Sequence, residues 1–261
     1  MKIFKHHFTE KESDITIISD SKETIDHAKK AFYRDRTILE NYVGKHPLFA
    51  SSFEPVKIYS SEPIIQIMNQ ASEIYQVGPM AAVAGAFADL MLLEMKSEKP
   101  DFIPAKTALV ENGGEIAIDS EIDMKIALYA GENRLNLNLG FLITKKDCPL
   151  GIATSSATIG HAVSLGRADA ATIFCKNAAN ADAAATKIAN SVQGDDIEQS
   201  IKKALDTVDE FPDIRGALIC RGDKIGYVGN MPQLFKIEGD KQNILKSKFE
   251  SAFSDDYEII K

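Results

Sequence analysis

Residues 77–93 constrain the fold more than any other stretch of the chain, because they are apolar on nearly every face of a helix. A helix without a polar face is stable in water only when other parts of the protein surround it. The stretch contains Pro79 and Asp89 and falls short of the ~20 apolar residues that a membrane span requires. Gly78 and Pro79 end the preceding helical pattern, and proline suits the first turn of a helix. We therefore expect a buried helix at the centre of the molecule.

Periodicity on both sides of this helix predicts an α+β protein. Alternating and β-branched residues predict strands over 2–8 and 15–19, and helical spacing of apolar residues predicts helices over 23–41 and 64–76. Short β-rich runs separated by turn residues then predict a strand meander between 107 and 144. A strand over 170–175, two helices and a hairpin over 217–229 complete the chain. We expect a single domain over 1–261 with a mainly antiparallel sheet and packed helices, because the strands lie in hairpins and no linker or repeat is visible.

Charge and cysteine content exclude several classes of partner. The 30 Lys and Arg residues and 38 Asp and Glu residues give a net charge of −8, which provides no general attraction for nucleic acid. The three cysteines (Cys148, Cys175 and Cys220) are odd in number and form no CxxC pair, which argues against a disulfide framework and a thiolate metal site. The first residues carry charges and no apolar segment typical of a signal peptide. We expect a cytoplasmic protein with neither nucleic acid nor membrane as a partner.

Asp182 and Thr186 form the most informative pair of polar residues. They lie four residues apart in an alanine-rich predicted helix and therefore share one face. A carboxylate and a hydroxyl in this arrangement suit Mg²⁺, which prefers hard oxygen ligands and keeps places for water or phosphate. With a backbone carbonyl they would make a half-site that a pyrophosphate completes. The alternative is an aspartate favoured by the helix dipole, with an incidental threonine.

Glu111, Asn112, Gly113 and Gly114 separate two predicted strands. Consecutive glycines allow positive φ angles and a close approach of a ligand to the backbone, but they also simply make a hairpin turn. No dinucleotide-binding, P-loop, zincin or α/β-hydrolase motif is present.

Residues 151–161 hold hydroxyls in what we expect to be a glycine-bounded turn between strands. Thr154, Ser155 and Ser156 suit recognition of phosphate or carbonyl groups, and the alternative is a turn that bonds its own backbone. His161 follows them and is the one histidine outside the first 46 residues. Imidazole exchanges protons near neutral pH, although a lone histidine is more often structural.

Taken in order, these motifs resemble those of the ApbE family, the FAD:protein FMN transferases once called thiamine-biosynthesis lipoproteins. The counterparts are AGAFAD at 84–89, VENGGEI at 110–116, GIATSS at 151–156, His161, the strand at 170–175, ADAAAT at 181–186 and the C-terminal hairpin. The chain resembles still more closely an uncharacterised, shorter ApbE-like family of bacteria and archaea. The resemblance covers residues 75–230. The family's lysine position is occupied by Ala84, the last glycine of its Ala-Thr-Ser-Gly motif by Ser156, and the residues after His161 differ.

The resemblance implies a site for FAD or a related flavin with Mg²⁺. It implies Asp182 and Thr186 as metal ligands and His161 as the catalytic base. It implies cofactor contacts from the two turns, namely Glu111, Asn112, Gly113 and Gly114 in the first and Ala153, Thr154, Ser155 and Ser156 in the second. We expect the two turns to converge and Asp182 to lie near a backbone carbonyl of residues 82–85.

Two functional hypotheses follow, together with a third on the same scaffold. The first is an ApbE-like enzyme that binds FAD or a related pyrophosphate compound with Mg²⁺ and transfers or hydrolyses its phosphoryl-linked half. The second is a non-catalytic flavin- or nucleotide-binding protein, and the third is a purely structural or interaction role. The sequence leaves open the ligand, whether the acceptor is a protein, whether there is turnover, and the oligomeric state.

Overall fold

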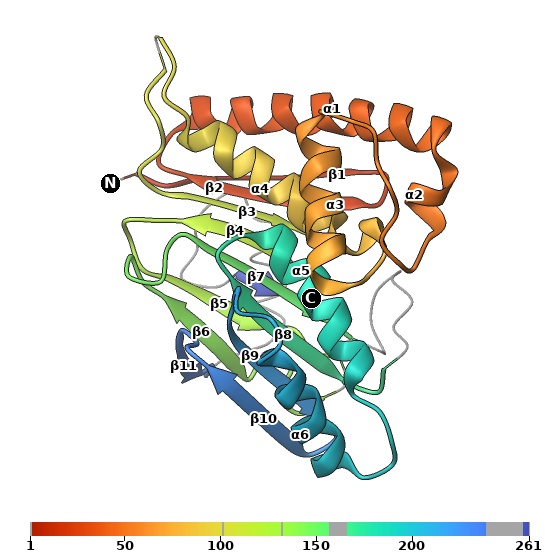
Figure 1. Ribbon diagram of the computed structural model, residues 1–261. Helices are drawn as coiled ribbons and strands as arrows, with labels where there is room; N and C mark the ends of the chain where they lie inside the picture. Colours follow the sequence, from red (N-terminus) through yellow and green to blue (C-terminus); the bar gives the residue numbers. More distant parts are fainter. Residues whose placement is uncertain (1, 101, 132, 157–165, 239–257, 261) are drawn as a thin grey trace.

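The structure is a computed structural model that describes residues 2–100, 102–131, 133–156 and 166–238, and the backbone of 258–260. Its main feature is an eight-stranded sheet with the strand order β1-β2-β3-β4-β7-β8-β9-β10 (Figure 1). Every neighbouring pair in this sheet is antiparallel. The strands are β1 (Phe4–Glu10), β2 (Ser13–Ser19), β3 (Ala108–Asn112), β4 (Glu115–Asp119), β7 (Leu150–Ser155), β8 (Ala170–Cys175), β9 (Ile214–Arg221) and β10 (Lys224–Gly229).

A second sheet of four strands has the order β11-β6-β5-β12. It contains β5 (Met124–Leu128), β6 (Leu139–Ile143), β11 (Gln233–Lys236) and β12 (Glu258–Ile260), of which β12 pairs with β5 in parallel. Side chains of β5 and β6 such as Ile126 and Phe141 pack with Ile18 and Leu109 of the larger sheet. The small sheet therefore covers one face of the large one.

Helices cover the other face of the large sheet (Figure 1). They are α1 (Lys22–Lys45), α2 (Pro47–Ser51), α3 (Pro63–Tyr75), the 3₁₀ turn η1 (Pro79–Ala82), α4 (Val83–Lys96), α5 (Ala178–Ser191) and α6 (Ile197–Val208). Alternation along β2 explains the two layers, since Ile15 and Ile17 face the helices whereas Ile18 faces the small sheet. Helix α4 packs against α1, α5 and β3 and is the central helix of its layer.

These elements confirm the predicted α+β class with mainly antiparallel sheet. The buried helix predicted over 77–93 is η1 followed by α4, and Pro79 opens it as expected. Residues 151–155, expected in a turn, instead form most of β7. The expected meander is divided, because β3 and β4 join the large sheet and β5 and β6 the small one. The extent of the domain along residues 1–261 stays a prediction.

No single helix of the described residues is both long and apolar enough to cross a membrane. The pair α3 and η1–α4 passes that test only when taken together, and it bends by 106°.

Candidate functional site

The site is built where α4 and α5 cross at very short range. A Cβ atom on Gly85 would lie 2.3 Å from the carbonyl oxygen of Ala178 and 2.7 Å from the backbone nitrogen of Ala179. Only glycine allows the first turns of the two helices to approach so closely. Close packing against α5 therefore explains the glycine at position 85 without a ligand.

Each of the two helices receives a carboxylate from the other at its N-terminus. Asp182 of α5 accepts a hydrogen bond from the Gly85 N–H of α4 through Oδ2, at 3.0 Å. Asp89 of α4 accepts the N–H groups of Ala178 and Ala179 in α5, both at 2.8 Å. The first N–H groups of a helix have no partner inside it, and a negative charge there is favoured by the helix dipole. The two helices therefore cap each other, and Asp182 caps α4 instead of its own helix.

Both carboxyl groups have raised pKa values. Burial raises the pKa of Asp89 from 3.8 to about 6, against the opposing effect of its two N–H donors. Burial raises the pKa of Asp182 to about 7, and the nearby charge of Asp89 adds to this. Neither carboxylate forms an ion pair with any described lysine, arginine or histidine. The crossing therefore holds two carboxylates whose charge the described side chains leave uncompensated.

The turn between β3 and β4 meets this crossing through one side chain. Asn112, the last residue of β3, donates a hydrogen bond from Nδ2 to the carbonyl oxygen of Ala84, at 3.3 Å. Gly113 and Gly114 follow with φ angles of 70° and 121°, which L-amino acids with a side chain adopt with strain. The hairpin interpretation of the two glycines is thus confirmed. Asn112, residues 84–85 and Asp182 form one connected set, which we call the α4–α5 site.

Strand β7 ends beside the same turn. Ile116 of β4 pairs with Ile152 of β7 in antiparallel register, so residues 153–155 of β7 run alongside the 113–115 turn. Ala153 and Thr154 are buried, and Thr154 shares a hydrogen bond of 2.9 Å with Thr172 of β8. Ser155 is partly exposed, and Ser156 is buried directly after the strand. The register thus places the end of β7 beside the turn between β3 and β4.

The remaining predicted site residues differ in their exposure, in the side of the sheet they face and in whether the structure describes them. Thr186 is partly exposed, one turn after Asp182 on α5. Glu111 is fully buried and faces the side of the sheet opposite to Asn112. His161 lies outside the described residues, so its role stays a prediction. Among the described residues no group of three or more His, Cys, Asp or Glu side chains could hold a metal ion. The expected ligand set of Asp182, Thr186 and a backbone carbonyl is of another kind and stays a prediction.

Asp89 is the residue of the site that sequence reasoning missed. In the sequence it is the charge that interrupts residues 77–93 and the last residue of AGAFAD at 84–89, and neither observation gave it a role in the site. A single carboxylate in an otherwise apolar helix is itself a signal, because a buried carboxylate needs donors or a cation. The helix N-terminus that supplies those donors becomes visible only in three dimensions.

Comparison with known proteins identifies the family. A family model described as "AbpE bacteria" matches residues 2–220. The chain belongs to this family. UPF0280 protein MMP1236 of Methanococcus maripaludis is 39% identical over 253 residues, covering 96% of this chain and 99% of the relative. UPF0280 protein MJ1526 of Methanocaldococcus jannaschii is 39% identical over 238 residues, covering 90% and 94%.

A solved structure agrees with the fold of this family. The apo form of the Pseudomonas stutzeri flavinyl transferase ApbE superposes with a TM-score of 0.50 over 87% of this chain and 94% of that chain. Its sequence identity is 12%, so the likeness supports the fold alone. The ApbE-like α+β architecture inferred from the order of the motifs is confirmed.

Proposed function

We propose that this protein binds FAD or a related flavin pyrophosphate together with Mg²⁺ at the α4–α5 site, and transfers or hydrolyses the phosphoryl-linked half of that ligand. The observation that carries the proposal is the convergence of Asn112, Ala84–Gly85 and Asp182 from three distant parts of the sequence. The name of the Pseudomonas stutzeri protein, a flavinyl transferase, agrees with a flavin as the ligand.

The chemistry of the donor set fits Mg²⁺. Asp182 uses its carboxylate to accept backbone N–H groups of α4, and a carboxylate has about four lone-pair positions, so places for a cation are left. The Thr186 hydroxyl lies one turn further on the same helix. The Ala84 carbonyl oxygen points away from the Gly85 N–H, as in any trans peptide, and accepts a hydrogen bond from Asn112. Burial raises the pKa of Asp182, and a divalent cation at the carboxylate would favour its ionised form. When bound, Mg²⁺ neutralises negative charge that develops on transferring phosphoryl oxygens.

The chain itself would position the ligand. The turn at Gly113 and Gly114 has no side chains, so a ligand could approach its backbone closely. The Gly113 N–H itself donates to the Asp14 carbonyl oxygen. Asn112 fixes the start of this turn against α4, so the turn and the carboxylate keep one geometry. Phosphoryl transfer depends mainly on such positioning and on charge stabilisation.

The test is FAD binding by isothermal titration calorimetry with Mg²⁺ and with EDTA. We expect binding that depends on Mg²⁺ and is lost in Asp182→Asn, because the amide keeps an oxygen for the Gly85 N–H but lacks the charge for a cation. Asp119→Asn is the matched control, since Asp119 lies at the other end of α4 and pairs with Lys96.

Mass spectrometry of the incubated mixture then distinguishes the reactions. Release of AMP with FMN on an acceptor indicates transfer, and AMP with free FMN indicates hydrolysis. Bound FAD that stays intact would favour a binding protein without turnover. Failure to bind FAD or any flavin pyrophosphate with Mg²⁺ would contradict the proposed function.

A further inference from the structure

Strand β10 lies at one edge of the large sheet, and no other described strand pairs with its outer side (Figure 1). Its exposed side chains are mainly apolar, since 66% of Tyr227 and 44% of Ile225 are exposed. The strand contains no proline and pairs with β9 in regular register along its whole length. Soluble proteins usually protect an edge strand with charges, proline or a bulge. β10 therefore has the composition of a strand that pairs with a further strand.

The opposite edge of the same sheet has the protection that β10 lacks. Strand β1 carries four titratable side chains among its seven residues, namely Lys5, His6, His7 and Glu10. β10 carries one charged side chain, Lys224, at its start, and the Glu198 carboxylate of α6 pairs with it at 2.6 Å. Like charges directly opposite each other destabilise a pair of strands. Of the two edges, β10 is therefore the one suited to an identical strand.

Backbone direction decides how a further strand can pair with β10. The Cys220 carbonyl oxygen of β9 accepts a hydrogen bond of 2.9 Å from the residue that precedes β8. Backbone groups alternate in direction along a strand, so those of Arg221 point towards β10, where Lys224 is its partner. The same alternation directs the N–H and C=O groups of Ile225 and Tyr227 away from β9. These groups are the donors and acceptors for a further strand.

An identical strand matches these donors and acceptors in a two-fold antiparallel pair. Ile225 of each copy then lies opposite Tyr227 of the other copy, and each such pair exchanges both of its N–H···O bonds. Pairs of an aromatic and a β-branched side chain across two strands also stabilise a sheet. Gly226 faces its own counterpart at the two-fold axis and has no side chain that would keep the strands apart. The surface is therefore complementary to itself.

Charges near the two ends of β10 favour the antiparallel direction. Helix α6 runs in the same direction as β10, because its first residue lies next to Gly222 and its Ile201 lies next to Gly226. The end of β10 therefore lies towards the exposed acidic residues in the last turn of α6 and directly after it, namely Asp206, Asp209 and Glu210. Antiparallel pairing brings Lys224 of each copy towards the acidic end of the other and keeps the two acidic ends apart.

We propose that β10 is the contact surface for a second copy of this chain, which adds to the large sheet as an antiparallel strand related by a two-fold axis. Ile225 and Tyr227 form the centre of this interface, and the two large sheets become one continuous sheet. The inference does not depend on the proposed function. A single pair of strands is small for a stable interface, so we expect a weak dimer with a Kd on the order of 10 µM.

The first experiment is hydrogen exchange of the full chain, read at single residues by mass spectrometry, at concentrations about tenfold below and about tenfold above that Kd. We expect the N–H groups of Ile225 and Tyr227 to exchange rapidly at the low concentration and slowly at the high one. The Gly226 N–H points towards β9 and should be protected at both concentrations. Protection of Ile225 and Tyr227 at both concentrations would mean that another segment of the same chain covers this edge, and rapid exchange at both would mean that nothing pairs with it. Either result would overturn the proposal.

The second experiment is sedimentation velocity over the same range of concentration. We expect a monomer–dimer equilibrium in the parent protein and a Kd raised ~10-fold or more in Tyr227→Lys, because two-fold symmetry places each substitution in the interface twice. Tyr59→Lys is the matched control, since 85% of Tyr59 is exposed and it lies in neither sheet. Urea unfolding checks that both variants fold, and if Tyr227→Lys does not, the exchange experiment on the parent protein decides. A parent protein that stays monomeric, an unchanged Kd in Tyr227→Lys, or an equal loss in Tyr59→Lys would overturn the proposal.

Discussion

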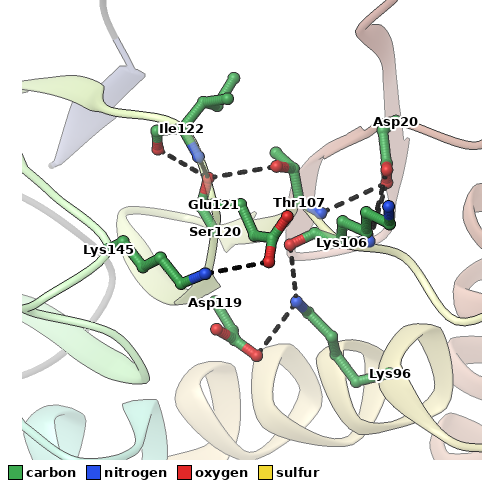
Figure 2. Close-up of polar contacts among 9 residues, drawn as sticks. All are labelled: Asp20, Lys96, Lys106, Thr107, Asp119, Ser120, Glu121, Ile122 and Lys145. Carbon is green, nitrogen blue, oxygen red and sulfur yellow. Dashed lines mark hydrogen bonds and ion pairs between the residues drawn. The ribbon is translucent and has the colours of Figure 1, made fainter. Parts of the chain in front are cut away.

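The carboxylates at the two ends of α4 have different partners and opposite pKa shifts. At its C-terminal end, shown in Figure 2, Lys96 contacts Asp119 and the Lys106 carbonyl oxygen, each at 3.0 Å. In the same cluster Lys145 pairs with Glu121 at 3.0 Å and holds its pKa below the ordinary value. At the N-terminal end, Asp89 and Asp182 contact backbone N–H groups and have raised pKa values.

This difference shows where a ligand could contribute most. The C-terminal cluster is complete, because its carboxylates have lysine partners or, in the case of Asp20, the N–H groups of Lys106 and Thr107 (Figure 2). The N-terminal end has donors for its carboxylates but no cationic side chain among the described residues. A buried carboxylate without a cation destabilises the folded state. The metal ion and phosphate of the proposed function would therefore contribute most at that end.

Gly85→Ala should have the largest effect, because it acts on the crossing itself. The new Cβ would lie 2.3 Å from the Ala178 carbonyl oxygen, so α4 and α5 would have to separate and both capping carboxylates would lose their geometry. We expect the free energy of unfolding to fall by about 3 kcal/mol, the upper part of the range for overpacked cores. Urea unfolding at constant pH measures it.

Gly44→Ala is the control for that change. Gly44 lies near the end of α1 with no atom within 4 Å of its added Cβ, so alanine should be neutral or stabilise by about 0.5–1 kcal/mol through helix propensity. Similar losses of stability in the two variants would contradict the close crossing.

The second prediction concerns pH. The pKa of Asp89 rises from 3.8 to about 6 on folding, so the folded state binds the proton more tightly than the unfolded state. The stabilisation is present below about pH 4 and is lost as pH rises through 6, and Asp182 extends the loss to about pH 7. For Asp89 the change corresponds to about 3 kcal/mol. The free energy of unfolding should therefore fall between pH 4 and 7 in the absence of divalent cations.

Asp89→Asn should flatten the lower part of that curve, whatever its effect on absolute stability. Glu121→Gln should leave the slope between pH 5 and 7 unchanged, since the pKa of Glu121 is lowered by Lys145. Mg²⁺ should reduce the slope in the parent protein but not in Asp182→Asn. A parent curve that is flat or rises between pH 5 and 7 would count against uncompensated carboxylates at this end.

The sequence predicted most of the elements because their patterns are local. Helical spacing located α1 and α3, and Gly78–Pro79 located the start of η1. The hydroxyls and glycines around residues 151–155 predicted a turn. In the structure these residues form β7, and the Thr154 hydroxyl forms a hydrogen bond with the Thr172 hydroxyl of the neighbouring strand β8. No local signal says which sheet a strand joins, so the division between β3–β4 and β5–β6 could not be predicted.

The candidate site was predictable only in part for the same reason. Four-residue spacing correctly placed Asp182 and Thr186 on one helix. The identity of the partner helix and the role of Asp89 as its reciprocal cap depend on contacts between distant segments. The resemblance led us to expect Asp182 near a backbone carbonyl of residues 82–85, and the structure shows its contact there with the N–H of Gly85.

The smallest effect should come from the C-terminal end of α4, where the charges are already paired. Lys96→Met removes the contacts with Asp119 and the Lys106 carbonyl oxygen but keeps the aliphatic chain along the helix. Because 41% of the Asp119 side chain is exposed, we expect a loss of only about 0.5 kcal/mol, within the range for solvent-accessible ion pairs. Salt screens exposed charges, so the loss measured by urea unfolding should shrink further as NaCl is raised from about 0.05 M to about 1 M and the screening length falls. The pH slope between 5 and 7 and the Mg²⁺ dependence of FAD binding should match those of the parent protein. A change in either property would mean that the two ends of α4 are coupled, and the division between a complete charge cluster and an incomplete one would then no longer hold.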